Sequence, residues 1–335
     1  MPEHLDPGLA DSDLAAALVR NAGRLALRMR DRGLEALRST ATEKANAADV
    51  VTAADMAAES YVVEQLLRCR PHDSIVGEEG AAHSGSTGRT WVIDPVDGTW
   101  NFYSGSTYWC SALALTEAGH DAGTSVGADL AAAPSVDTAG ASAADPADTS
   151  SGSSPAGPPG AATAGAGASP SSPSGADALA DADVLLGAIY QPQEDKLWLG
   201  GLLQPATLNG VPIGVDPRQD VGALAAVTYL HPGWLAEPRA AVPWQRAARL
   251  PATLRMLGSG SCDLGRVAQG ELGVWFQHSC PAWDWLPGKA IVRAAGGGTA
   301  VVRVNGLDWF VAGPAGAVQA IQAALESADP AVSGQ

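Results

Sequence analysis

Hydrophobic side chains recur at helical spacing in two stretches near the N-terminus. In residues 8–33 the large aliphatic side chains fall on one face of a helix, which Ser12 can cap at its start and Gly33 can close at its end. Residues 53–69 repeat this pattern and stop before Pro71, which cannot continue a helix. The pattern therefore predicts two helices before the first strand.

Short apolar runs follow, with the length and composition of strands. The predicted strands are residues 74–77, 90–93, 108–115 and 185–190. Three more helices are predicted at residues 261–270, 286–295 and 314–326, and a hairpin turn at Asn209-Gly210. Helices that alternate with short strands indicate a layered α/β or α+β enzyme fold.

One long segment, residues 121–183, breaks this alternation. It has no aromatic or basic side chain and is rich in Ala, Gly, Ser and Pro. Such a composition cannot bury enough apolar surface to offset the entropy of ordering the chain, so disorder is expected. Because both flanks resemble strands, we interpret the segment as an insertion in a hairpin loop, between an N-terminal part at 1–120 and the remainder of the same domain at 184–335.

Half of the net charge of −16 comes from this segment. Eight aspartates lie in residues 121–183, and without them the net charge is −8, which is ordinary for an enzyme. No basic patch indicates binding to nucleic acid, and no apolar run is long enough to span a membrane. The N-terminus has acids where a signal peptide has positive charge, and the four cysteines lack metal-site spacing, so a cytoplasmic protein with free thiols is expected.

Several acidic residues stand out, and each has a plain structural interpretation. Asp55 completes a capping box with Thr52, and Asp284 can cap the helix predicted after it. Glu78 lies beside a second glutamate between two glycines, as in a solvated turn, and Asp94-Pro-Val-Asp97-Gly can be a simple turn. Taken one at a time, short motifs of this kind often match by accident.

Together the acids around residue 94 favour a different interpretation. Asp94 follows a predicted strand, and Asp97 comes three residues later. Gly98 permits a backbone conformation in which consecutive N–H groups bind an anion, and Thr99 adds a hydroxyl. Two oxygen ligands beside an anion-binding turn are what a magnesium-dependent phosphatase needs.

Electrostatics supports a bound cation. Two carboxylates about 4 Å apart repel each other by about 4 kcal/mol at an effective dielectric constant near 20. A cluster of four would take up protons in part or bind cations. Since Mg²⁺ accepts one or two carboxylates together with waters and phosphate oxygens, several carboxylates suit two or three ions.

These motifs, in this order, resemble the inositol monophosphatase family of the lithium-sensitive, magnesium-dependent phosphatases. The family pattern places an Asp after "VT", then "GEE", "DPxDGT" and "WDxxxG". The chain has "DVVTAAD" at 49–55, "GEE" at 77–79, "DPVDGT" at 94–99 and "WDWLPG" at 283–288. The resemblance implies an αβαβα sandwich, a homodimer, and a phosphomonoesterase that hydrolyses a small phosphorylated polyol or sugar.

The resemblance also implies a set of metal ligands. Glu78 and Asp94, with the Val96 carbonyl, would hold the first Mg²⁺. Asp94, Asp97 and Asp284 would hold the second, and Glu78 would also serve a third, weaker ion. Water activated by these ions would attack phosphorus in line.

Further roles follow from the same resemblance. Asp55 would position a water near the third ion, with Lys44 at the same rim. Glu78 and Thr99 would orient the attacking water, and the N–H groups of Gly98 and Thr99 would hold the phosphate.

The substrate side departs from the family pattern. Gln277 stands where family members that act on inositol phosphates have a Glu, seven residues before the Asp of "WD", and Trp100 follows "DGT" where a small residue or lysine is usual. Gly260, Trp100 and Gln277 are the expected substrate contacts, and the aromatic "HPGWL" at 231–235 is a further candidate.

Three phosphatase alternatives stay open, for histidinol phosphate, fructose 1,6-bisphosphate and 3′-phosphoadenosine 5′-phosphate. A non-catalytic relative that binds metal or phosphate and regulates a partner is the alternative from another class. The full set of carboxylates argues against it.

Overall fold

The computed structural model describes residues 4–33, 35, 42–43, 50–117, 183–202 and 204–327. The predicted site residue Lys44 and the predicted insertion, apart from Asp183, lie outside these described residues.

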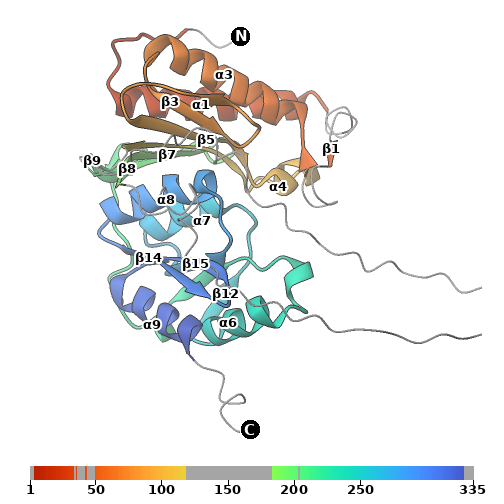
Figure 1. Ribbon diagram of the computed structural model, residues 1–335, viewed down its shortest axis with the longest axis vertical. Helices are drawn as coiled ribbons and strands as arrows, with labels where there is room; N and C mark the ends of the chain where they lie inside the picture. The colour runs from red at the N-terminus through yellow and green to blue at the C-terminus, as the bar shows by residue number, and fades with distance from the viewer. Residues whose placement is uncertain are drawn as a thin grey trace, which may run out of the picture.

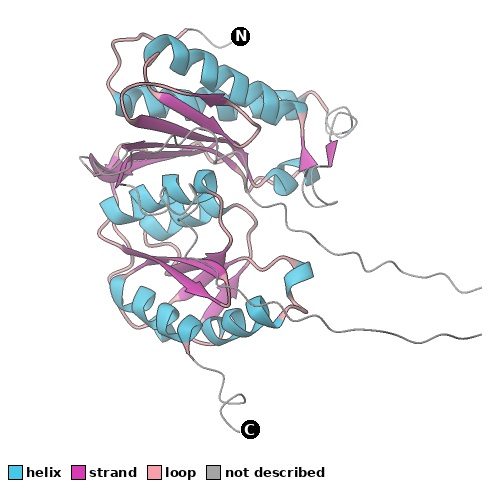
Figure 2. Cartoon of the chain, in the orientation of Figure 1, coloured by secondary structure: helices cyan, strands magenta, loops and turns pink. Residues whose placement is uncertain are grey.

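Five layers of secondary structure form the molecule, which confirms the predicted αβαβα sandwich (Figure 1). Helices α1 (Asp11–Asp31) and α3 (Ala53–Cys69) cover the outer face of an eight-stranded sheet. Helices α7 (Gly260–Ala268) and α8 (Ala282–Ala294) fill the space between this sheet and a five-stranded sheet. Helices α6 (Pro238–Ala248) and α9 (Ala315–Glu326) cover the far face of the second sheet, and Figure 2 shows the alternation of helices and strands.

The first sheet has the strand order β10-β9-β8-β7-β6-β5-β3-β4. Its neighbours are antiparallel except for β3 and β5, which are parallel. The strands are β3 (Ser74–Gly77), β4 (Ala82–His83), β5 (Arg89–Asp97), β6 (Cys110–Glu117), β7 (Asp183–Gln191), β8 (Lys196–Gly201), β9 (Gln204–Leu208) and β10 (Val211–Pro212). A two-stranded hairpin of β1 (Thr42–Glu43) and β2 (Val50–Val51) stands apart from this sheet, and the short helix α4 (Thr99–Ser104) follows β5.

The second sheet has the order β12-β11-β13-β15-β14. In it β11 is parallel to both β12 and β13, whereas β15 is antiparallel to β13 and β14. The strands are β11 (Ala225–Thr228), β12 (Thr253–Arg255), β13 (Val274–His278), β14 (Gly298–Val304) and β15 (Leu307–Gly313), with short 3₁₀ turns at Val221–Ala223 and Pro232–Trp234.

Close backbone approach fixes the middle layer. Gly288 of α8 faces Leu264 of α7 with no room for a Cβ atom, and Gly187 of β7 meets the Pro287 carbonyl in the same way. The side chains of Trp275, Trp285 and Phe310 then pack with ring centroids 5.2–5.6 Å apart. Helices α7 and α8 are thereby held against both sheets, which matters because both carry site residues at their first turns.

The helix and strand predictions agree with the structure most closely at α3, β3 and α9. The bounds of α3 and β3 are those predicted, and α9 begins one residue later than predicted. The N-cap of α1 is Ala10 and not Ser12, and Asp11 in its first turn binds Arg70 and Arg89.

Two boundaries near the site differ from the prediction. Helix α8 begins at Ala282, four residues earlier than predicted, with Pro281 at the N-cap, so Asp284 lies inside the first turn and does not cap the helix. Strand β5 continues past residue 93 through Asp97, because Cys110 of β6 still pairs with it there.

The described cysteines are all free and buried, as expected. Across the described ranges, no helix has the length and apolar character needed to cross a membrane.

Candidate functional site

A bulge in β5 brings Asp94 and Asp97 to the same side of the sheet. Side chains alternate along a strand, so two residues three positions apart would normally point to opposite faces. Asp94 pairs with Ala112 and Asp97 with Cys110, so β5 has one residue more than β6 over this stretch. An extra residue of this kind shifts the alternation and re-aims the side chains that follow it. The motif's spacing alone could not reveal this bulge.

Glu78 comes next to Asp94 through strand pairing. Strand β3 runs parallel to β5 with Gly77 opposite Ile93, and the Glu78 N–H donates to the Ile93 carbonyl at 3.1 Å. Glu78 is therefore level with Asp94 on the neighbouring strand.

Glu59 of α3 holds the turn that presents Glu78. Its carboxylate accepts hydrogen bonds from the N–H groups of Glu79 at 2.9 Å and Ala81 at 3.0 Å. It lies so close to Gly77 that a Cβ atom there would force the carboxylate to move. Sequence reasoning missed Glu59, although a charged residue among the alanines of "AADMAAES" on the inner face of a helix was a signal.

Asp97 is anchored by the first turn of α7. Its Oδ1 accepts the Gly260 N–H at 3.1 Å, and its Oδ2 accepts the Ser261 N–H. Burial raises the pKa of Asp97, while the hydrogen bonds from Ser261, Ser259 and Gly260 oppose that rise. The N–H of Gly260, a predicted substrate contact, is thus already engaged by Asp97.

Four carboxylates influence one another at this point. Asp94 is 1% exposed, and its pKa is raised well above the ordinary value, first by burial and then by the charges of Glu78, Asp97 and Asp284. Asp284 reaches the group from the first turn of α8. The other three side chains that the sequence proposed as metal ligands are therefore near enough to Asp94 for their charges to raise its pKa.

The donor chemistry of this group fits a hard cation. All four side chains offer carboxylate oxygens, and Asp94 Oδ1 is buried without a hydrogen-bond partner among the described residues. As they stand, no three acidic, histidine or cysteine side chains in the described ranges are close enough to hold one ion. Metal binding would therefore require these carboxylates to draw together.

Asp55 does make the predicted capping box at the start of α3. Its Oδ2 accepts the Thr52 N–H at 3.1 Å and the Thr52 hydroxyl. Burial, followed by the nearby charge of Glu79, raises the pKa of Asp55 to about 7 although Thr52 opposes this. Asp55 Oδ1 is buried and has no hydrogen-bond partner in the described part of the chain. Its charged neighbour is Glu79, one residue beyond the predicted ligand Glu78.

The turn after β5 has the left-handed glycine that the sequence predicted there. Gly98 has φ 88° and ψ 43°, a left-handed conformation that favours glycine, and Thr99 begins α4. The Thr99 hydroxyl donates to the Val96 carbonyl at 3.0 Å, which leaves that oxygen one lone pair for another ligand. Trp100 is 49% exposed and packs on Tyr103 with ring centroids 5.5 Å apart.

Asn101 connects this turn to α7 and was also missed. Its amide donates to the Tyr108 carbonyl at 2.8 Å and to the Leu257 carbonyl at 2.7 Å. The residue thus ties α4 to the loop that leads into α7, where Asp97 is anchored.

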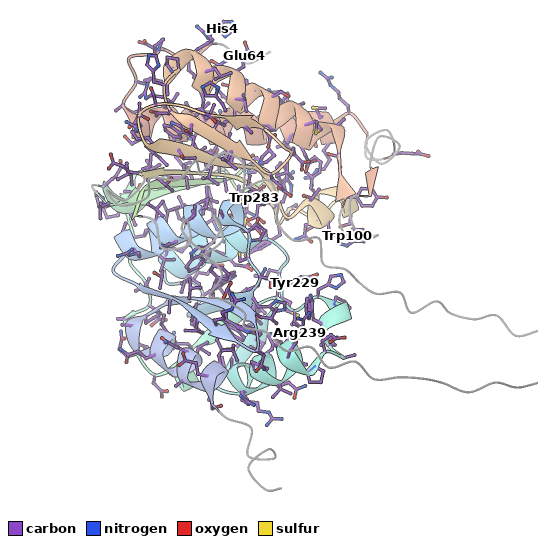
Figure 3. All side chains as sticks on the ribbon, viewed as in Figure 1. His4, Glu64, Trp100, Tyr229, Arg239 and Trp283 are labelled. Carbon is purple, nitrogen blue, oxygen red and sulfur yellow. The ribbon has the colours of Figure 1, made fainter. Side chains whose placement is uncertain are left out.

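The remaining substrate candidates lie on the second sheet. Gln277 is half-buried near the end of β13, and its neighbour His278 packs edge-on against Trp234 with ring centroids 5.1 Å apart. The "HPGWL" segment therefore packs against the end of β13. Figure 3 labels Trp283, Trp100 and Tyr229 at heights between the first sheet and Arg239.

Comparison with known proteins identifies the family to which the chain belongs. The model of the inositol monophosphatase family matches residues 11–128 and 178–329. The inositol-1-monophosphatase of Rhizobium meliloti is 24% identical over 252 residues, which cover 75% of this chain and 71% of that protein. A histidinol-phosphatase of Mycobacterium tuberculosis is 49% identical over 69 residues, which cover 21% of this chain and 26% of that protein.

The fold has close counterparts among solved structures. The extragenic suppressor protein suhB from Bartonella henselae aligns with a TM-score of 0.69 at 19% identity, covering 95% of this chain and 98% of that one. The matched ranges include β3, after which Glu78 follows, β5 and α8, which carry the three aspartates described above, and α7, which anchors Asp97. The chain therefore belongs to the inositol monophosphatase family and is a phosphatase that hydrolyses phosphate monoesters.

Proposed function

We propose that the chain is a Mg²⁺-dependent phosphomonoesterase that acts on a small phosphorylated alcohol of the polyol or sugar kind. The observation that carries this proposal is the group of four carboxylates around Asp94, beside the left-handed turn at Gly98. A buried group of like charges is costly unless cations or protons neutralise it. A metal-dependent phosphatase uses such cations in its reaction.

Glu78, Asp94, Asp97, Asp284 and the Val96 carbonyl would hold the ions. Bound Mg²⁺ supplies a water of lowered pKa and neutralises charge on the phosphate oxygens. The protein itself would position and polarise the phosphate: the N–H groups of Gly98 and Thr99 would donate hydrogen bonds to its oxygens. Glu78, which follows β3 level with Asp94, would accept a proton from the attacking water.

Asp55 and Thr99 have supporting roles in this proposal. The buried Asp55 oxygen that lacks a partner would accept a hydrogen bond from a water near Glu79. The hydrogen bond from the Thr99 hydroxyl to the Val96 carbonyl would hold the first turn of α4 beside Asp97.

Histidinol phosphate is the second candidate substrate. The stretch of 69 residues that is 49% identical to a histidinol-phosphatase favours it, because the inositol-1-monophosphatase of Rhizobium meliloti matches at 24%. The match to the inositol-1-monophosphatase covers 75% of the chain, whereas the match to the histidinol-phosphatase covers 21%. A phosphorylated polyol or sugar therefore remains the first candidate substrate.

Release of inorganic phosphate from a panel of monoesters tests the proposal. Inositol 1-phosphate, glycerol 1-phosphate and histidinol phosphate are compared with Mg²⁺ and with EDTA, and Li⁺ is added in a third series. We expect turnover with Mg²⁺, its loss in EDTA and its inhibition by Li⁺. Turnover that persists in EDTA would contradict the metal-dependent mechanism.

A further inference from the structure

The bulge in β5 exchanges the faces on which the last residues of the strand lie. Val92 packs in the buried cluster that joins the first sheet to α7 and α8. An unbroken alternation would place Val96 on that same face and Asp97 on the opposite one. Val96 instead packs with Ala26 of α1 and Ala54 of α3, and Asp97 accepts N–H groups from α7. The position of Asp97 in the site therefore depends on the bulge.

Ser111 of β6 bonds directly to this bulge. Strand pairing leaves Ser111 opposite two residues of β5, Pro95 and Val96, where one is usual. The Ser111 hydroxyl donates to the Pro95 carbonyl at 2.6 Å, and Ser111 is 1% exposed. Since β5 lies inside the sheet, a proline is tolerated there only at such an irregularity, because it has no N–H for the ladder. A side chain therefore holds the backbone at the point where the ladder is interrupted.

Ser111 reaches the bulge from the face of the sheet that α1 covers. Its neighbour Cys110 faces the other way, with Sγ 3.7 Å from the hydroxyl of Ser259 at the start of α7. A Cβ atom on Gly23, in the middle of α1, would come within 3.3 Å of Ser111 Oγ. Glycine weakens the interior of a helix, so its place in α1 is explained by the room that the Ser111 hydroxyl needs.

We propose that Ser111 is a positioning residue for the metal site, because its hydrogen bond to Pro95 holds the bulge that turns Asp97 towards the other carboxylates. The inference rests on the proposed function. The next carbonyl, that of Val96, accepts the Thr99 hydroxyl at 3.0 Å, so two successive carbonyls of the bulge are each fixed by a hydroxyl. Without the Ser111 bond the bulge can relax, and metal binding must then restore the orientation of Asp97 by itself.

The test follows the melting temperature over a titration of Mg²⁺ without substrate, which gives an apparent Kd for the metal. For Ser111→Ala we expect this Kd to rise by about fivefold or more, because binding no longer has the support of one buried hydrogen bond. Thr116→Val is the matched control. Thr116 also lies on β6, is 1% exposed and donates its hydroxyl to a β5 carbonyl, that of Thr90 at 3.3 Å, but at the far end of the strand pair. Both substitutions should lower the melting temperature without metal, and only Ser111→Ala should raise the Kd.

Ser111→Cys makes the same comparison if Ser111→Ala does not fold, since a thiol is a weaker donor of similar shape, and its Kd should rise by about twofold. A folded variant at Ser111 with the wild-type Kd would show that Ser111 supports the fold alone, and would overturn the inference. An equal rise in Kd for Thr116→Val would overturn it as well, because general loosening of the strand pair would then be the cause. A wild-type protein whose melting temperature ignores Mg²⁺ would overturn the proposed function and this inference with it.

Discussion

Two neighbouring aspartates of the same motif have opposite surroundings. Asp97 accepts two backbone N–H groups from α7, whereas Asp94 is buried with an oxygen that lacks a partner within the described ranges. Asp97 therefore has an architectural role besides any metal binding, whereas the charges of neighbouring carboxylates raise the pKa of Asp94. The sequence pattern identified both residues but could not separate these roles, because they depend on the bulge in β5 and on residues more than 160 positions away.

Glu59→Gln should weaken both stability and turnover. Glutamine keeps one acceptor oxygen and brings an NH₂ group against the N–H of Glu79 or Ala81. We expect the free energy of unfolding to fall by about 1–3 kcal/mol and kcat to fall more than KM changes, because the turn that presents Glu78 loosens. Chemical denaturation and steady-state kinetics measure the two effects.

Glu64→Gln on the same helix is the control, since the Glu64 side chain is exposed near His4. Equal effects of the two substitutions would contradict the role assigned to Glu59.

His278 should make the fold sensitive to acid. Burial, with a further contribution from Arg239, lowers the pKa of His278 to about 4 from the ordinary 6.5. The unfolded chain then binds the proton more readily, so stability is complete above pH 6.5 and declines as the pH falls towards 4. The difference in pKa corresponds to at most about 3 kcal/mol.

Urea denaturation between pH 4 and pH 7 measures this effect. His278→Gln should flatten the curve in that range, and replacement of the exposed His72 should not. A curve that His278→Gln leaves unchanged would show that His278 contributes nothing to the acid sensitivity.

At the scale of elements, the site depends on how α4 and α7 are joined. Asn101→Ala removes two hydrogen bonds, to the Tyr108 and Leu257 carbonyls, and leaves both acceptors without that donor. We expect a loss of about 1–3 kcal/mol in the free energy of unfolding and a drop in kcat, because the α7 turn that anchors Asp97 is released. Asn21→Ala is the control, since Asn21 joins α1 to Tyr61 of α3 by one bond of 2.8 Å away from the site. A fall in stability with wild-type kcat would show that Asn101 supports the fold but not the site.

The connection between β6 and β7 should be replaceable. These strands are antiparallel neighbours, and Glu117 pairs with Asp183, so the two ends of the connection are adjacent. Exchanging residues 118–182 for an Asn-Gly turn should leave the melting temperature and kcat nearly unchanged, because two residues can close such a hairpin. Differential scanning fluorimetry and a phosphatase assay measure both, and a large fall in either would show that the replaced segment supports the domain or the site.

Helices and strands were predictable where one face is buried and the other is solvated. Helix α3 and strand β3 have the predicted bounds because Thr52 and the Pro71 stop are local signals. No strand of the second sheet was predicted, and two of them, β11 and β12, are only four and three residues long and pair with partners distant in sequence. The start of α8 was misplaced because Pro281, not an aspartate, lies at its N-cap.

At the scale of the whole molecule, five layers place four carboxylates from β3, β5 and α8 beside the first turns of α4 and α7. The motifs alone identified the acids and their order. The residues that hold them, Glu59 and Asn101, emerge only from the packing of α3 on the first sheet and of α4 against the loop before α7. The sequence could therefore predict the residues that carry the chemistry of the site better than the residues that hold them in place.

The central claim is that the carboxylates around Asp94 form a site for Mg²⁺. The most direct measurement is the melting temperature of the wild-type protein and of Asp94→Asn over a titration of Mg²⁺ without substrate. The wild-type melting temperature should rise and saturate, because an ion that binds only the folded state stabilises it by about 2.7 kcal/mol at a hundredfold excess over Kd. In the absence of metal, the melting temperature of Asp94→Asn should be no lower than that of the wild type, because the substitution removes repulsion from Glu78, Asp97 and Asp284. Its melting temperature should change little when Mg²⁺ is added. A wild-type protein indifferent to Mg²⁺, or an Asp94→Asn variant with the full wild-type response, would contradict the claim.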